Sequence, residues 1–396
     1  GILFLGGGST VTIAQRMFEG MNSFALLAIP LYTFAGFTMS KGGISKRLMD
    51  FCYSIVGHIY GGLAHVNVLS SMIFAGISGS AVADTAGVSG MFMPEMVRKG
   101  YSKNFTVAVT AISSTIGIII PPSIPMVVIA GICGISTGKL FLGGIIPGIL
   151  CGLAQMIVSY FLAKKEGVPK EPGHFTIGPV LHGLWESWPA LLMPIIIVGT
   201  ITMGIVSPTE AGVIAVVYGL FAGGIIYREL KWEDIKFAFA ETVRTSGRIF
   251  IVIGAAKLYT VMLTTAGFDK WVAKTMLGFS TNPTVILIMI LLIFFIVTMF
   301  MESIATLTLF MPILYPIALG VGINPIVLSV LITVVIGIGL VTPPVGMCIY
   351  VACDLMDTTV GEVFPTLVPF IAATFVCIAL MVAFPQLILL PTYLMA

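Results

Sequence analysis

The sequence predicts an all-α polytopic membrane protein with two re-entrant helical hairpins and two broken helices, arranged as an inverted repeat. Hydrophobic residues make up 58% of the 396 residues and charged residues 9%, against roughly 25% charged in an average soluble domain. Two polar or glycine-containing stretches, residues 75–84 and 301–306, interrupt apolar regions. Two Pro-Pro pairs, beginning at Pro121 and Pro343, interrupt two other apolar regions. Backbone that leaves the helical path at membrane depth must face protein or a water-filled cavity.

The first 60 residues predict a scaffold unit with one span and one surface helix. Residues 23–40 are apolar over nearly the length of about 20 residues that a span requires. In residues 41–57, Lys41, Lys46 and Arg47 alternate with apolar side chains, which is typical of an amphipathic helix on the membrane surface. The sequence begins with Gly1 rather than Met, so we expect that an N-terminal part precedes it.

Residues 61–139 predict the first hairpin and the first broken helix, which we assign to a transport unit. Residues 61–77 enter the membrane and residues 82–97 leave it, with basic residues before and after both segments. The positive-inside rule therefore places both ends in the cytoplasm, and residues 78–80 form the tip. Residues 105–120 cross outward to Pro121-Pro122 and resume at 124–135, because proline cannot continue the helical hydrogen-bond ladder.

The remaining residues predict a second set of the same elements. Residues 140–282 are assigned to the scaffold, with spans 140–163, 189–206, 211–227 and 249–266, a cytoplasmic connector 164–188, and amphipathic stretches 232–244 and 268–277. Residues 283–364 hold the second hairpin (285–300 and 304–319) and a helix, 325–341, that meets Pro343-Pro344. Residues 365–396 form a C-terminal scaffold unit, with the last span at 365–390.

Proline spacing predicts that the two halves are repeats. The same spacing separates Pro121 from Pro343 and Pro147 from Pro369, whereas Pro312 follows Pro94 at a slightly shorter one. We expect a four-residue insertion between hairpin and broken helix to account for the difference. The first hairpin opens to the cytoplasm and the second to the outside, so the repeat is inverted, as in many secondary transporters.

A hairpin tip opposite a broken helix gathers hydroxyl and carbonyl oxygens, which suit a hard cation. We predict one sodium ion in each half and no organic cofactor. The first predicted site comprises Ser78, Gly79, Ser80, Asp84, Ser114, Gly117 and Pro121. The second predicted site comprises Glu302, Ser303, Thr306, Gly337, Gly339, Thr342 and Pro343. Substrate is expected between the tips, near Ser80, Ser123, Lys257 and Thr342.

Structural interpretations of the same residues stay open. Small residues let helices pack closely, Asp84 and Glu302 could be partners of nearby hydroxyls, and Lys257 could pair with an acid. Residues 134–138 fit Gly-x-Ser-x-Gly, which makes an intramembrane serine protease a distant alternative, although no strand-to-helix turn surrounds Ser136. The net charge of +2 indicates no nucleic-acid partner.

The sequence resembles the large membrane subunit of TRAP transporters over essentially its whole length. The resemblance rests on residues 75–84 (AGISGSAVAD) and 113–125 (SSTIGIIIPPSIP), and is supported by 27–36, 61–67, 207–212 and 342–346. It implies a bacterial inner-membrane protein in the lipid bilayer that imports organic acids with sodium, through an elevator movement of the two hairpins. It also implies a small four-helix membrane subunit, separate or fused upstream, and a periplasmic substrate-binding protein.

The substrate expected first is sialic acid, with four-carbon dicarboxylates next. The alternative is a sodium/anion symporter of related fold that needs no binding protein.

Overall fold

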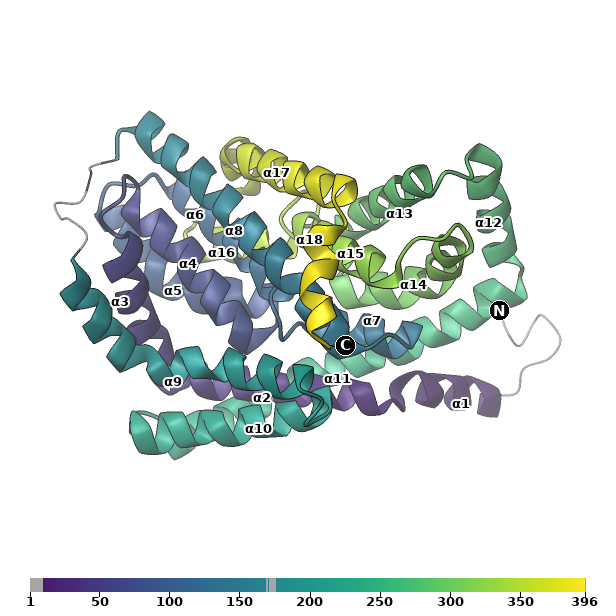
Figure 1. The fold of residues 1–396 in the computed structure, drawn as a ribbon, viewed down its shortest axis with the longest axis horizontal. Coiled ribbons are helices and arrows are strands. Elements are labelled where there is room, and N and C mark those ends of the chain that lie inside the picture. Colours follow the sequence, from purple (N-terminus) through teal and green to yellow (C-terminus); the bar gives the residue numbers. More distant parts are fainter. Residues whose placement is uncertain (1–9, 169, 171–175, 396) are drawn as a thin grey trace.

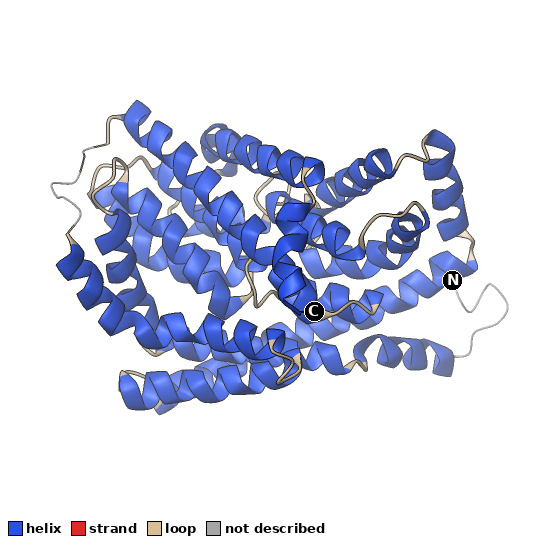
Figure 2. Ribbon diagram, in the orientation of Figure 1, coloured by secondary structure: helices blue, strands red, loops and turns tan. Residues whose placement is uncertain are grey.

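The computed structural model describes residues 10–168, 170 and 176–395, and the ordered elements in these ranges are helices and turns without a strand (Figure 2). Seven of the described helices are long and apolar enough to cross a membrane. Four more are apolar but shorter, Gly62–Ser78, Ile124–Cys133, Pro283–Thr298 and Pro325–Gly339, as expected for hairpin arms and half-helices. The predicted all-α membrane fold is confirmed.

The first half contains a scaffold segment, a hairpin and a broken helix. The scaffold segment consists of α1 (Thr10–Met21), the 3₁₀ turn η1 (Phe24–Leu27), α2 (Ala28–Lys41) and α3 (Ile44–Val56). The hairpin consists of α4 (Gly62–Ser78) and α5 (Ala81–Arg98). The broken helix consists of α6 (Lys103–Ser114), the 3₁₀ turn η2 (Thr115–Ile118) and α7 (Ile124–Cys133), and α8 (Thr137–Glu166) follows it.

Two helices connect the halves, α9 (Ile177–Thr202) and α10 (Pro208–Phe221), and α10 ends in a π-helical turn, η3 (Ala222–Ile226). The second half begins with α11 (Trp232–Thr265) and α12 (Phe268–Phe279). Its hairpin is α13 (Pro283–Thr298) and α14 (Ser303–Gly320), and its broken helix is α15 (Pro325–Gly339) and α16 (Met347–Leu355). The chain ends with α17 (Val360–Ala383), α18 (Gln386–Leu389) and the 3₁₀ turn η4 (Leu390–Met395).

A single spacing relates the two halves, and it is the spacing from Pro121 to Pro343, called here the repeat spacing. Helices α5 and α14 begin at this spacing and have the same length of 18 residues, and α6 and α15 also begin at this spacing. Pro94 of α5 therefore corresponds to Pro316, and the predicted match with Pro312 is wrong. The predicted four-residue insertion does not exist. The error arose because Pro312 and Pro316 both lie in α14, about one helical turn apart.

The two hairpins approach the middle of the molecule from opposite ends (Figure 1). In that view α4 and α5 come from the left and α13 and α14 from the right. The second part of each broken helix packs on the hairpin of the other half, α7 against α14 and α16 against α5. The halves are thus interlocked around the two tips.

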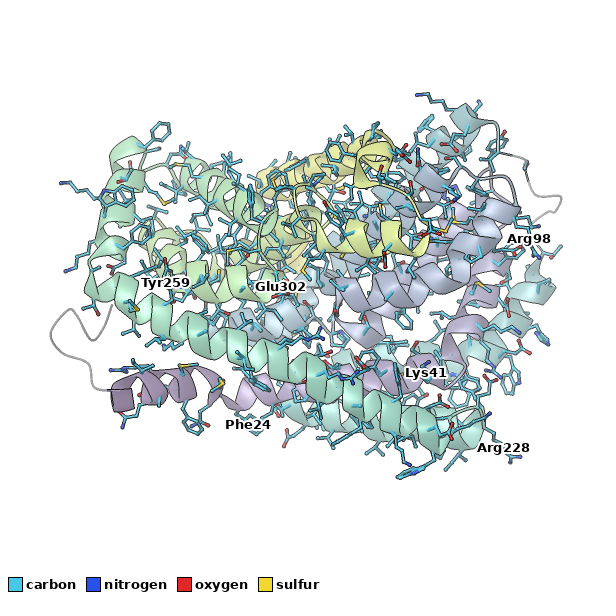
Figure 3. All side chains as sticks on the ribbon, turned by 180° about the vertical axis from the view of Figure 1, so that it is seen from behind. Phe24, Lys41, Arg98, Arg228, Tyr259 and Glu302 are labelled. Carbon is cyan, nitrogen blue, oxygen red and sulfur yellow. The ribbon has the colours of Figure 1, made fainter. Side chains whose placement is uncertain are left out.

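One end of the molecule carries the basic residues that mark the cytoplasm. Lys41, Arg98 and Arg228 lie toward the same end, and Tyr259 lies toward the other (Figure 3). By the positive-inside rule, the mouth of the first hairpin faces the cytoplasm. Glu302, at the tip of the second hairpin, lies between the two ends.

Three predicted boundaries are wrong. The connector predicted at 164–188 is shorter, because α8 continues to Glu166 and α9 already begins at Ile177; residues 169 and 171–175 lie outside the described ranges. Gly183 allows the early part of α9 to pack closely on α3, since an added Cβ would lie 3.1 Å from the Phe51 Cα. The stretch predicted at 232–244 is continuous with the following span in α11, and the span predicted at 365–390 ends before Pro385.

Helices α8 and α17 pack against each other and against α6. Helix α8 also contacts α4 and α15. Packing thus groups both helices with the hairpins and broken helices, whereas the sequence placed them in the scaffold. The division of the helices into a moving transport unit and a fixed scaffold stays a prediction.

Candidate functional site

The first hairpin tip is joined to the first helix break by a backbone hydrogen bond. The N–H of Ile124 donates to the carbonyl of Gly79 (3.2 Å). Gly79 has a left-handed backbone (φ 66°), and an added Cβ would lie 2.6 Å from the Pro122 carbonyl oxygen. Glycine fits both requirements, because it has no side chain to clash and adopts positive φ readily. The tip therefore lies directly on the break that follows Pro121.

Asp84 is the buried acid of this junction. Its side chain is 0% exposed, in the first turn of α5. The Ser78 hydroxyl donates to Oδ1 of Asp84, and Oδ2 has no hydrogen-bond partner among the described residues. A buried carboxylate oxygen without a partner is costly and points to a functional ligand.

The unpartnered oxygen faces Gly117, in the 3₁₀ turn at the end of α6. A Cβ added to Gly117 would collide with Oδ2 and would lie 3.0 Å from Cγ of Asp84. Gly117 therefore lets the carboxylate approach the backbone of the broken helix. This arrangement fits a cation, because a carboxylate oxygen and main-chain oxygens are hard ligands.

Three other predicted serines, two of the first ion site and one of the substrate site, form hydrogen bonds with residues close to them in the sequence. Ser80 caps α5, where its Oγ accepts from the N–H of Ala83 (3.4 Å), and it is partly exposed. Ser114 donates to the Thr110 carbonyl (2.7 Å). Ser123 donates to the Ile118 carbonyl (2.5 Å) and caps α7. Of these three hydroxyls, only that of Ser80 belongs to a residue that is partly exposed.

The second hairpin tip is joined to its own break in the same way. The N–H of Val345 donates to the Met299 carbonyl (3.0 Å), just before the tip. Gly339 lies against the end of α13, where an added Cβ would lie 2.6 Å from the Thr298 Cβ. Gly117 and Gly339 are separated by the repeat spacing, so the two equivalent glycines each admit a residue of their own hairpin.

Glu302 has a different environment from Asp84. It is the N-cap of α14, and its carboxylate accepts from the N–H groups of Ile304 (2.8 Å) and Ala305 (3.3 Å) and from the Ser303 hydroxyl (2.6 Å). These bonds satisfy free donors at a helix N-terminus. Glu302 thus caps the helix, and its role as an ion ligand stays a prediction.

The remaining hydroxyls of the second predicted site bond to backbone. Thr306 donates to the Glu302 carbonyl (3.0 Å), and Thr342 donates to the Ile338 carbonyl (2.7 Å). Thr342 and Pro343 lie at the break. Gly337 packs against Thr115 of the first half, with an added Cβ 3.2 Å from the Thr115 Cβ. The two broken helices therefore cross at Gly337.

Sequence reasoning missed the contact between Cys348 and Thr85. Both side chains are buried at the α16–α5 interface, where Cys348 lies beside Thr85 and within electrostatic range of Asp84 and Glu302. The two acids therefore flank a junction between the halves. No motif singled out either residue, because their contact depends on α16 packing against the opposite hairpin.

Lys257 and Ser136 do not lie with the tips. Lys257 is exposed on α11 and packs against α1, where an added Cβ at Gly20 would lie 2.6 Å from the Lys257 Cβ. Ser136 is exposed in the turn between α7 and α8 and caps α8 by accepting from the N–H of Lys139 (3.4 Å). The structure thus gives Ser136 a capping position.

A helical inverted repeat with two hairpin tips on two broken helices is the architecture of secondary transporters. The profile of the DctM component of tripartite ATP-independent periplasmic transporters matches residues 1–387, and the chain belongs to this family. Its members are transporter permeases rather than enzymes, and this chain is a multi-pass protein of the bacterial inner membrane.

Relatives support the family over nearly the whole chain. The sialic acid large permease SiaM of Vibrio cholerae is 36% identical, covering 95% of this chain and 88% of that protein. The C4-dicarboxylate large permease DctM of Pseudomonas aeruginosa is 34% identical, covering 99% of this chain and 92% of that protein. The isethionate permease DctMQ of Oleidesulfovibrio alaskensis is 37% identical over 91% of this chain, which spans only 57% of that relative.

A solved structure shows the same fold. The YdaH transporter of Alcanivorax borkumensis aligns with a TM-score of 0.61 over 96% of this chain and 90% of its own, at 13% identity. At this identity the likeness concerns the fold alone.

Proposed function

We propose that this chain is the large membrane subunit of a sodium-coupled importer of small organic anions. The observation that carries the proposal is Asp84, a fully buried acid with one unpartnered oxygen at the junction of hairpin tip and broken helix. A sodium ion between Oδ2 and the backbone near Gly117 would supply the missing partner. Substrate would lie beside the partly exposed Ser80.

The relatives support an organic anion without choosing one. Their names record sialic acid, C4-dicarboxylates and isethionate at 34–37% identity, so identity does not separate these substrates. We propose sialic acid as the first substrate to test and four-carbon dicarboxylates as the second. A periplasmic binding protein would deliver the anion, and a small membrane subunit would support the scaffold, in keeping with the tripartite family.

The proposed transport step moves both hairpins together as an elevator. The interlocked packing of α7 on α14 and α16 on α5 supports a common movement, since separating the hairpins would break both contacts. The paired hairpins and broken helices would carry ion and anion across the membrane against α1–α3 and α9–α12.

The test is uptake of labelled sialic acid into proteoliposomes with the small subunit, with and without a sodium gradient and a candidate binding protein. We expect uptake to need both. Uptake that needs sodium alone would favour the symporter that works without a binding protein. Without any uptake, the same assay is run with four-carbon dicarboxylates, and sodium-independent uptake of either anion would refute the coupling.

Asp84→Asn is the decisive variant, because asparagine keeps the shape and can still accept from Ser78. We expect it to abolish sodium dependence, whereas the matched Asp269→Asn on α12 keeps it. Unchanged sodium dependence in Asp84→Asn would refute the first ion site.

A further inference from the structure

A column of buried polar side chains leads from the cytoplasmic end of the first hairpin toward Asp84. Its members on α6 are Thr106, Thr110 and Ser113, and its members on α4 are Asn67, Ser71 and Ser78; all are buried. Residues 106, 110, 113 and 117 share one face of α6 and its 3₁₀ extension, because they are spaced by three or four positions. Gly117, the last of these positions, faces Asp84.

Hydrogen bonds connect the column across the two helices. The Asn67 Nδ2 donates to the Thr110 hydroxyl (2.7 Å), and the Ser113 hydroxyl is 3.0 Å from the Asn67 Oδ1. The Ser71 hydroxyl donates to that of Ser113 (3.1 Å). These hydrogen bonds join specific polar atoms of the hairpin and the broken helix, which the close packing of small residues alone would not require.

Buried atoms without protein partners occur along the same column. The Thr106 Oγ1, the Gln155 Oε1 and the Asp84 Oδ2 have no hydrogen-bond partner among the described residues, and each side chain is 0% exposed. Gln155 reaches the column from α8, where its Nε2 donates to the Ile112 carbonyl (3.3 Å). Native proteins satisfy buried polar atoms with protein, water or an ion, so these atoms indicate hydration.

The second half provides an internal comparison. At the repeat spacing, the six hydroxyl and amide members of the column are replaced by apolar residues: Met289, Ile293, Phe300, Leu328, Ile332 and Val335. The two buried hydroxyls of α15, Ser329 and Thr333, each donate to a carbonyl of their own helix. A polar column is therefore not a requirement of the repeated fold, and it occurs in the half whose hairpin opens to the cytoplasm.

We infer that this column is the route by which the cation at Asp84 exchanges with the cytoplasm. Its hydroxyl and amide oxygens offer successive hard contacts from Thr106, one turn inside α6, to the hairpin tip. The inference rests on the proposed sodium site, but hydration of the column can be tested separately. The column is closed in this conformation, because its members are buried, so exchange requires the hairpin and α6 to separate slightly.

The experiment measures whether silver ions, which bear the same charge as sodium and bind thiolates, reach the column from the cytoplasm. Ser113→Cys is introduced after the six native cysteines are replaced, and transport activity is confirmed first. Val335→Cys is the matched control, because Val335 is the repeat equivalent and is 1% exposed. Inhibition of uptake is followed after silver is added to either membrane face.

We expect cytoplasmic silver to inhibit Ser113→Cys at least tenfold faster than Val335→Cys, and sodium to slow that inhibition. Equal rates in the two variants would overturn the proposed route. Faster inhibition that sodium does not slow would support the route while refuting sodium at Asp84, which separates the two proposals. Ser71→Cys repeats the test from α4 if Ser113→Cys does not transport.

Discussion

Gly117 lies against the unpartnered oxygen of Asp84, so Gly117→Ala perturbs the proposed first ion site without changing a charge. The added Cβ would lie 3.0 Å from Cγ of Asp84 and would collide with Oδ2. Carbon atoms in favourable contact are about 3.5–4.0 Å apart. Cγ must therefore retreat by about 0.5–1 Å, and Oδ2 by more, from the position in which the carboxyl group faces the broken helix.

The expected effect on sodium binding follows from this displacement. Holding the carboxylate in its original place against the new methyl group costs about 1–3 kcal/mol, as in other overpacked sites. The sodium-free protein can relieve the clash by tilting Asp84 away, so most of the cost falls on the bound state. We expect the sodium concentration for half-maximal uptake to rise about 5- to 150-fold.

The assay is sodium-dependent uptake in proteoliposomes, measured over a range of sodium concentrations at fixed substrate and binding protein. Gly131→Ala on α7 is the control, because nothing lies closer than 3.7 Å to an added Cβ there. We expect this control to keep the original half-saturation. A Gly117→Ala protein with unchanged half-saturation would show that Asp84 does not bind sodium in the position described.

Three further substitutions test neighbouring features. Ser78→Ala removes the donor to Asp84 and should destabilise the protein by about 1–3 kcal/mol; an unchanged thermal unfolding midpoint would contradict this. Gly339→Ala places a Cβ 2.6 Å from that of Thr298, which should also destabilise the protein by about 1–3 kcal/mol. An unchanged thermal unfolding midpoint would show that Gly339 does not pack tightly against the end of α13. Ser136→Ala removes only a helix cap, so uptake per folded molecule should stay complete, and its loss would reopen a chemical role for this serine.

The sequence predicts the order of the helices and breaks, because the signals for each of them lie within a short stretch of the chain. Apolar runs, basic residues at their ends and the two Pro-Pro pairs each act on their own segment of backbone. Both hairpin tips were therefore predicted within a residue or two. The division of α11 and the late start of α9 were wrong, because amphipathic residues near the membrane surface form helices that continue into a span.

Only the tertiary structure decided which residues meet. The sequence contained Asp84 and Gly117, but their contact depends on how the hairpin rests on the broken helix. Pro312 and Pro316 are equally plausible repeat partners of Pro94, since both lie in one apolar helix, and the helix ends select Pro316. The side of α11 that Lys257 occupies could not be read from its sequence, because apolar residues surround it and face selection depends on the packing of α1 and α14.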